Sequence, residues 1–197
     1  MKKNIAIFII MASAMITGCA KNDKTMGKDF LGLALERYSV RSFSDKKVEQ
    51  KELDMILRAG QVAPTAVNNQ PQKIYVIQSE EALAKINAVS PCIYGAPQVF
   101  LVCYDSNISW KKPGDEWPSG VMDASIVLTH MMLQAAELGI GTCWVCMFDI
   151  EKTKEAFNLP DNIEPVALMP FGYATEDAKP SPSHSEYRPI EETVNYL

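Results

Sequence analysis

The chain has 197 residues, of which 47% are hydrophobic and 22% charged, and its formal net charge is −5. This acidic balance excludes the basic footprint of a nucleic-acid-binding protein, and the apolar fraction is too high for a disordered chain. Five cysteines and two histidines are too few and too scattered for a disulfide scaffold or a multi-ligand zinc site. The length predicts one globular domain.

The first 28 residues predict an export signal followed by a tether. Lys2 and Lys3 precede an apolar run over residues 5–16, which is shorter than the roughly 20 residues of a membrane-spanning helix. The run leads into Ile-Thr-Gly-Cys, which resembles the bacterial lipobox, in which the cysteine is lipidated. We expect a signal peptide over residues 1–18, lipidation at Cys19, a tether over 19–28 and a membrane-anchored lipoprotein on the periplasmic or outer-membrane side. The alternative is an uncleaved apolar end on a cytoplasmic protein.

The remaining residues, 29–197, predict one domain of interleaved helices and strands. Apolar residues at helical spacing predict helices over residues 30–38, 48–63, 80–88, 121–138 and 150–157. Runs rich in β-branched and aromatic residues predict strands over residues 73–78, 98–104, 142–147 and 165–173. Residues 98–104 are apolar without alternation, as in a strand buried on both faces. The helix over 121–138 is apolar almost all round, so it should be buried in the domain or in a dimer interface. A polar loop is expected over 105–120 and an extended arm from residue 178.

Two segments carry polar groups that suit a nucleotide. Arg37, Ser39 and Arg41 alternate after the first helix, so in an extended segment they point the same way and could grip a phosphate. The alternative is a solvated loop. Residues 64–71, Pro-Thr-Ala-Val-Asn-Asn-Gln-Pro, offer neutral donors and acceptors for the edge of a planar heterocycle, or form only an Asn-rich turn.

The cysteines and histidines give weaker signals. Cys143 and Cys146 form a C-x-x-C motif, which is typical of a redox disulfide or half a metal site. In the predicted strand, however, they would face opposite sides and lie too far apart for a disulfide. His130 is expected in the core, and His184 is expected to be exposed on the arm.

Taken together, these segments resemble the nitroreductase family of FMN-dependent oxidoreductases. The matching segments run in order through nearly the whole chain from residue 30: Arg37-x-Ser39-x-Arg41, Ala63-Pro64-Thr65-Ala66-x-Asn68-x-Gln70-Pro71, Leu138-Gly139-x-Gly141-Thr142-Cys143-Trp144, Phe148-Asp149, Pro170-x-Gly172-Tyr173 and Arg188-Pro189. Each motif is weak alone, but their common order and spacing are specific.

The resemblance implies an α+β fold with a central, mostly antiparallel sheet flanked by helices, and an intertwined homodimer with two FMN at its interface. It places the FMN phosphate against Arg37, Ser39, Arg41 and Arg188, and it counts Tyr38 among the cofactor-binding residues. The groups that would reach the flavin from the partner subunit are Pro64, Thr65, Asn68 and Gln70. Backbone N–H groups of Cys146 and Met147 would meet the flavin edge, and the C-terminal arm would wrap the other protomer.

This sequence departs from the family pattern at two places. A lysine that often precedes the late arginine is replaced by Glu186-Tyr187, which leaves the phosphate more dependent on Arg37 and Arg41. Cys146 and Met147 stand where the family often has a glycine or an acid, and their size would narrow the acceptor site.

The implied function is ping-pong, two-electron reduction of nitroaromatic, quinone or related conjugated acceptors by NAD(P)H or another donor. The flavin carries this chemistry, so no catalytic side chain and no metal are expected. The expected partners are a second copy of the chain, the donor and a small acceptor, with membrane contact through the lipid anchor only and no nucleic acid. An exported enzyme would not meet cytoplasmic NAD(P)H, so either the donor differs or the leader is not an export signal. The alternatives are a lipid-anchored thiol-disulfide protein using Cys143 and Cys146, and a non-catalytic flavin-binding lipoprotein.

Overall fold

The computed structural model describes residues 29–114 and 117–197. The predicted signal peptide, the tether and the lipidation site Cys19 lie outside the described residues. Within the described part of the chain, no helix has the length and apolar character needed to cross a membrane.

The order of elements follows the sequence prediction closely. The longer helices are α1 (Phe30–Glu36), α2 (Gln50–Gln61), α3 (Glu80–Val89), α4 (Gly120–Glu137) and α5 (Ile150–Phe157). The strands are β1 (Gln72–Ile77), β2 (Gln98–Asp105), β3 (Gly141–Thr142) and β4 (Ile163–Gly172). Short 3₁₀ turns are η1 (Ala66–Asn68), η2 (Pro182–Ser185) and η3 (Ile190–Glu192).

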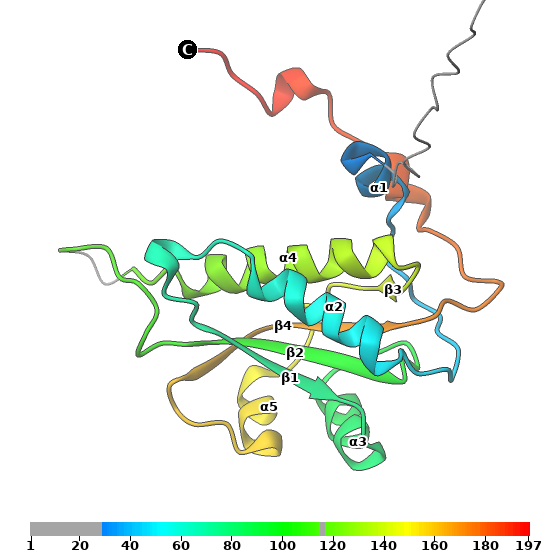
Figure 1. The fold of residues 1–197 in the computed structure, drawn as a ribbon, viewed down its shortest axis with the longest axis horizontal. Helices are drawn as coiled ribbons and strands as arrows, with labels where there is room; N and C mark the ends of the chain where they lie inside the picture. Colours follow the sequence, from blue (N-terminus) through cyan, green and yellow to red (C-terminus); the bar gives the residue numbers. More distant parts are fainter. Residues whose placement is uncertain (1–28, 115–116) are drawn as a thin grey trace, which may run out of the picture.

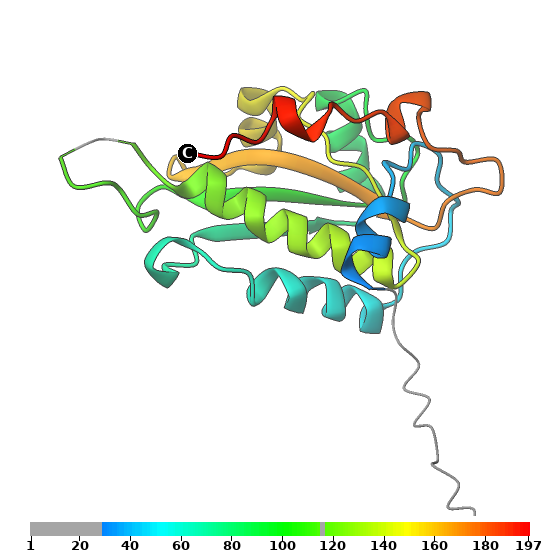
Figure 2. The ribbon, with the colours of Figure 1, turned by 90° about the horizontal axis from the view of Figure 1, so that it is seen from above.

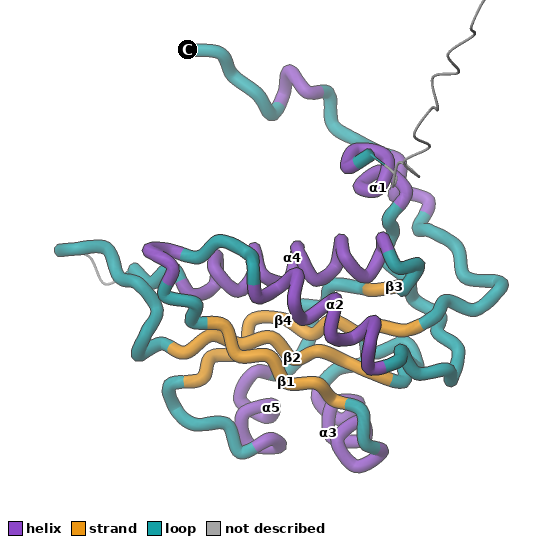
Figure 3. The backbone as a smooth tube through the Cα atoms, viewed as in Figure 1, coloured by secondary structure: helices purple, strands orange, loops and turns teal. Residues whose placement is uncertain are grey.

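The strands form one sheet in the order β1-β2-β4-β3, and every neighbouring pair is antiparallel. Helices α2 and α4 cover one face of this sheet, and α3 and α5 cover the other (Figure 1). The same three layers are visible when the chain is coloured by secondary structure (Figure 3). The prediction of an α+β fold with an antiparallel sheet flanked by helices is therefore confirmed.

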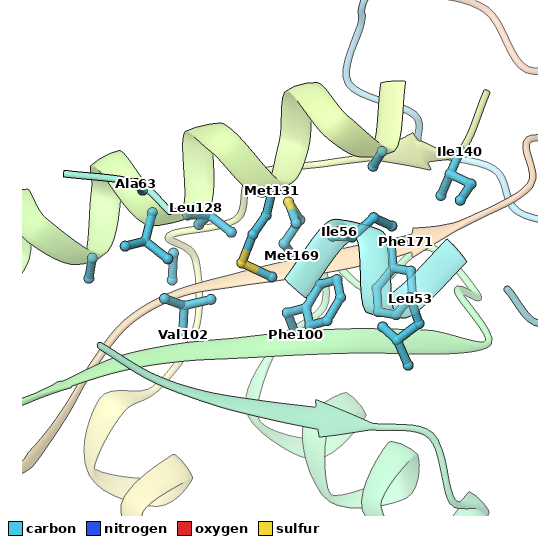
Figure 4. Close-up of a cluster of buried hydrophobic side chains, with 14 of the residues drawn as sticks. Leu53, Ile56, Ala63, Phe100, Val102, Leu128, Met131, Ile140, Met169 and Phe171 are labelled. Carbon is cyan, nitrogen blue, oxygen red and sulfur yellow. The ribbon is translucent and has the colours of Figure 1, made fainter. Parts of the chain in front are cut away.

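Strand β2 divides the core into two clusters. Phe100 and Val102 face α2 and α4, whereas Leu101 and Cys103 face α3 and α5, and all four are fully buried. Phe100 also stacks on Phe171 of β4, with ring centroids 4.1 Å apart (Figure 4). The continuous apolar run of β2 thus reflects burial on both faces, as its sequence predicted.

Helices α2 and α4 run side by side along one face of the sheet (Figure 2). Gly60 of α2 allows the two helices to approach closely, since a Cβ there would lie 2.8 Å from Cγ of Met131.

The starts of α3 and α5 are set by local hydrogen bonds. Ser79 and Asp149 act as their N-caps, and the side chains of both residues accept hydrogen bonds from backbone N–H groups of the first turn.

The prediction of a strand over residues 142–147 is largely wrong. Regular pairing with β4 stops after Thr142, and only one isolated bridge follows, between Val145 and Leu168. Cys143 donates its N–H to the Pro170 carbonyl at 3.2 Å, but Pro170 has no N–H to donate in return. The ladder is therefore interrupted next to Pro170.

Helix α4 is buried in the domain along only one of its faces. Ala124, Val127 and Leu128 are fully buried, while Met122 and Ile126 remain exposed. The expectation of a core His130 is wrong. This residue is half-buried in a groove between α2 and α4, where its Nδ1–H donates to the Ile126 carbonyl at 2.9 Å.

The C-terminal arm turns away from the sheet and ends apart from it (Figure 1). It contains η2 and η3 rather than being wholly extended, and its apolar side chains Tyr187, Ile190 and Tyr196 are exposed. The predicted loop connects β2 to α4.

Candidate functional site

The segment after α1 is held in an extended conformation against β3. Arg37 caps α1 and leaves it with φ −60° and ψ 131°. Ser39 pairs with Thr142 in an isolated parallel bridge, and the Val40 N–H donates to the Thr142 carbonyl at 2.9 Å. Val40 is buried and Arg41 is exposed, so alternate side chains of this segment face the core and the surface.

The buried thiol of Cys143 lies near the polar groups of this segment. Burial raises the pKa of the Cys143 thiol above its ordinary value. The charge of Arg41, a hydrogen bond with the Ser39 hydroxyl and the charge of Arg37 act on the same pKa in the opposite direction. Of the three groups predicted to hold a phosphate, Ser39 and Arg41 line one small pocket, whereas Arg37 lines a neighbouring pocket with Tyr38 and Val40.

The C-x-x-C motif has one buried and one exposed thiol. Cys143 is buried and Cys146 exposed, and neither is in a disulfide. Cys146 Sγ accepts a hydrogen bond from Trp144 Nε1 at 3.2 Å. A buried thiol with a raised pKa stays protonated and is a poor nucleophile, so this geometry does not favour thiol-disulfide exchange.

Residues 146 and 147 form an exposed strip that is held by hydrogen bonds to the end of α3. The buried Ser90 hydroxyl donates to the Met147 carbonyl at 2.7 Å, and the Asp149 N–H donates to the Val89 carbonyl at 3.0 Å. Within residues 29–114 and 117–197, the backbone N–H groups of Cys146 and Met147 donate no hydrogen bond. The strip is therefore exposed and held in place, and its two backbone donors are left without a partner among the described residues.

The loop between α2 and β1 has an unusual backbone. Val67, Asn68 and Gln70 have φ values of 46°, 58° and 50°, a left-handed conformation that is uncommon for residues other than glycine. The Thr65 hydroxyl accepts from the Gln70 N–H at 3.0 Å. Pro64, Asn68 and Gln70 are exposed, so the loop presents its polar groups outward. Such local strain is often concentrated at functional sites.

The residue that anchors this loop was not predicted from the sequence. Asp123, in the first turn of α4, is buried and accepts from the Ala66 N–H at 2.8 Å through Oδ1. Its Oδ2 accepts from the Ser119 hydroxyl at 2.6 Å. The available signal was an acidic residue four positions after Ser119, at the start of an otherwise apolar helix.

The loop and the arginine segment lie at opposite ends of α4 in one chain (Figure 1). The loop is tied to the first turn of α4 through Asp123, and the arginine segment is tied to Thr142, just beyond its last turn. Helix α4 has 18 residues, which corresponds to about 27 Å. A single chain therefore does not bring Thr65, Asn68 and Gln70 to the arginines.

Two residues of the C-terminal arm, Arg188 and His184, lie in different surroundings. Arg188 is exposed and pairs with Glu192 on the same arm at 3.0 Å, and it is not among the residues that line the pocket beside Arg41. His184, by contrast, is not fully exposed as expected. It packs edge-on against Tyr38, with ring centroids 6.2 Å apart.

Comparison with known proteins identifies the family. The model of the nitroreductase family matches residues 34–92 and 88–173. A protein of Methanothermobacter thermautotrophicus, provisionally named NADH dehydrogenase/NAD(P)H nitroreductase, is 32% identical over 78% of this chain and 82% of its own. An FMN reductase [NAD(P)H] of Bacillus subtilis is 28% identical over 80% of this chain and 69% of its own.

Solved structures agree with this assignment. A nitroreductase family protein of Clostridium difficile is 40% identical, covers 85% of this chain and 98% of its own, and superposes with a TM-score of 0.81. A provisionally named nitroreductase of Exiguobacterium sibiricum, solved in complex with FMN, shares the fold with a TM-score of 0.76 at 22% identity over 86% of this chain and 97% of its own. The chain belongs to the nitroreductase family.

Proposed function

We propose that two copies of this chain form a dimer with two flavin sites, each of which uses FMN to pass two electrons from NAD(P)H to a small conjugated acceptor. Nitroaromatics and quinones are the acceptor classes that this chemistry suits. The observation that carries the proposal is the separation of the two candidate binding segments by the length of α4. One flavin can touch both segments only if they come from different chains.

The residues present fit the parts of FMN. Arg37, Ser39 and Arg41 supply the charge-assisted donors that a phosphate accepts. The exposed N–H groups of Cys146 and Met147 suit the acceptor edge of the flavin heterocycle. The names of the Bacillus subtilis relative and of the Exiguobacterium sibiricum complex support FMN as the ligand.

The contribution of the protein would be binding and orientation. When bound, FMN supplies the hydride chemistry. The side chains of Thr65, Asn68 and Gln70 are neutral, and no acid or base stands among them, so they would orient the ring system and the acceptor. Donor and acceptor would use the same exposed face in turn, which gives a ping-pong order.

The apolar surface of α1, α2 and α4 supports the dimer. A groove of about 760 Å³ lies between α2 and α4, where the apolar side chains of Met55, Ala59 and Val62 are flanked by charged and polar residues: Lys51, Asp54, Arg58, His130 and Gln134. A second groove of about 440 Å³ lies between α1 and α4 and includes Phe30 and Leu133. Contiguous apolar surface of this kind marks an interface. The exposed apolar side chains of the arm are suited to pack against the second copy.

We also propose that the chain is a lipoprotein anchored through Cys19 on the periplasmic or outer-membrane side. The support is the order of Lys2 and Lys3, the apolar run and Cys19 in the sequence. The full chain should fractionate with membranes, and Cys19→Ser should release it. A wild-type chain found in the soluble fraction would contradict the lipid anchor.

The proposed oxidoreductase activity is tested by an anaerobic titration of the purified protein with NADH and with NADPH. The protein should carry a flavin whose visible absorbance bleaches with a donor and returns on addition of a quinone or nitroaromatic. A flavin that no donor bleaches would indicate a non-catalytic binding protein. Failure to take up added FMN would contradict the proposal as a whole.

A further inference from the structure

We propose that the first turn of the C-terminal arm completes the phosphate end of the flavin site, with His184 and Ser183 as binding residues. This inference rests on the proposed function. It assigns a ligand-binding role to a part of the arm that lies before Arg188, and it places that role on the same chain as Arg41.

A small pocket joins the arm to the arginine segment. Its volume is about 190 Å³, and the residues that line it come from two segments far apart in sequence: Tyr38, Ser39, Arg41, Ser181, Ser183 and His184. Pockets for whole drug-sized ligands measure roughly 300–1,000 Å³. This pocket is therefore suited to one end of a larger ligand.

The lining of the pocket selects an anion. It contains a guanidinium, an imidazole, a phenol and serine hydroxyls, and none of the residues that line it is acidic. This is notable in a chain with a formal net charge of −5. Arg41 is partly positioned already, since its Nη1 donates to the Ser39 carbonyl at 3.4 Å. Hydroxyl and guanidinium donors around a small anion are typical of phosphate recognition.

His184 is held in place by contacts with α1 and with the residue that follows Arg37. Its Nε2 lies 3.2 Å from the Leu35 carbonyl, and its ring packs edge-on against Tyr38 at an interplanar angle of 68°. A carbonyl can only accept, so Nε2 carries a proton and Nδ1 is the nitrogen left for a ligand. A phosphate oxygen beside Nδ1 would accept a hydrogen bond from the ring through a proton on that nitrogen.

The turn itself is closed by local hydrogen bonds. The His184 N–H donates to the Ser181 carbonyl at 2.8 Å within η2. This turn fixes Ser183 and His184 on the side of the pocket, whereas Ser185 in the same turn does not line it. Ser185 is therefore a matched control for Ser183.

The inference is tested by comparing the affinities of FMN and riboflavin, which differ only in the phosphate. Both ligands are titrated into the wild-type chain and into His184→Ala, Ser183→Ala and Ser185→Ala, and the quenching of flavin fluorescence is followed. His184→Ala should weaken FMN binding about 10-fold or more, and Ser183→Ala about 3- to 10-fold. Riboflavin affinity should be unchanged in each variant, and Ser185→Ala should behave as wild type.

The outcomes separate this inference from the proposed function. If the wild-type chain prefers FMN to riboflavin and His184→Ala and Ser183→Ala keep that preference, the arm does not hold the phosphate and the inference is overturned, while the proposed function stands. If the variants lose affinity for FMN and for riboflavin equally, the arm residues support the folded structure rather than the phosphate, and the inference is likewise overturned. A wild-type chain that binds neither ligand would overturn both.

Discussion

At the scale of single residues, Arg41 is the most informative position, because it lies in the pocket and acts on the Cys143 thiol. Arg41→Ala should weaken FMN binding by about 1.5–3 kcal/mol, as expected for a lost hydrogen bond to a charged group. Riboflavin affinity should not change. Lys85→Ala on α3 removes a surface cation on the other face of the sheet and serves as the control. Equal FMN affinity in Arg41→Ala and wild type would remove Arg41 from the phosphate site.

The cysteines should differ sharply in reactivity with iodoacetamide. Cys146 is exposed and should be alkylated first, whereas burial raises the pKa of Cys103 to about 12 and also raises the pKa of Cys143. Raising the pH from 7 to 9 should therefore leave Cys103 protonated and unreacted in the folded protein, and the buried Cys143 should react more slowly than Cys146, as mapped by mass spectrometry. Alkylation of Cys143 as fast as Cys146 would revive the thiol-disulfide alternative.

At the scale of elements, the packing of α4 on β2 depends on Gly120. A Cβ at this position would collide with the aromatic ring of Tyr104. Gly120→Ala should therefore lower the free energy of unfolding by about 1–3 kcal/mol, as measured by denaturant titration. In the double variant with Tyr104→Leu, the two effects should be less than additive, because the smaller side chain relieves the collision. Strict additivity would show that the ring is not the cause.

The elements that the sequence predicted well are those whose pattern is local. Helix α2 buries Leu53 and Ile56 at helical spacing, and β2 is a continuous apolar run, so both were found at nearly their observed bounds. The strand over 142–147 was overestimated, because the interruption comes from Pro170, a residue on another strand. The local sequence pattern carries no information about residues on a neighbouring strand.

The same distinction applies to the candidate site. Arg37, Ser39 and Arg41 were found because alternation in an extended segment is visible in the sequence. Asp123 was missed because its partners, the Ala66 N–H and the Ser119 hydroxyl, are recognisable only once the loop and helix are placed together. His184 was expected to be exposed for the same reason, since Tyr38 lies in a distant part of the chain.

At the scale of the whole molecule, the exposed face of α4 should hold the dimer together. Met122 and Ile126 are 50% and 38% exposed, and charges placed on them would remain unpaired in an apolar interface. Met122→Glu with Ile126→Glu should yield a monomer by light scattering and should lose bound FMN with it. Lys85→Glu, on α3 across the sheet, should stay dimeric. A monomer that retains FMN would contradict a shared site.

The most direct test of a site shared between two chains uses mixed dimers. One chain carries Arg41→Ala, and the other carries Asn68→Gly with Gln70→Gly, which removes two amides while suiting the positive φ of both positions. Each variant alone forms dimers with two damaged sites. In the mixed dimer both lesions fall in one site, and the other site is intact.

The measurement is the number of FMN molecules bound per purified mixed dimer at wild-type affinity. A site built from the arginine segment of one chain and the loop of the other predicts one FMN per mixed dimer and none in either variant homodimer. A mixed dimer that binds no FMN at wild-type affinity would contradict it, because every site would then carry a lesion within its own chain.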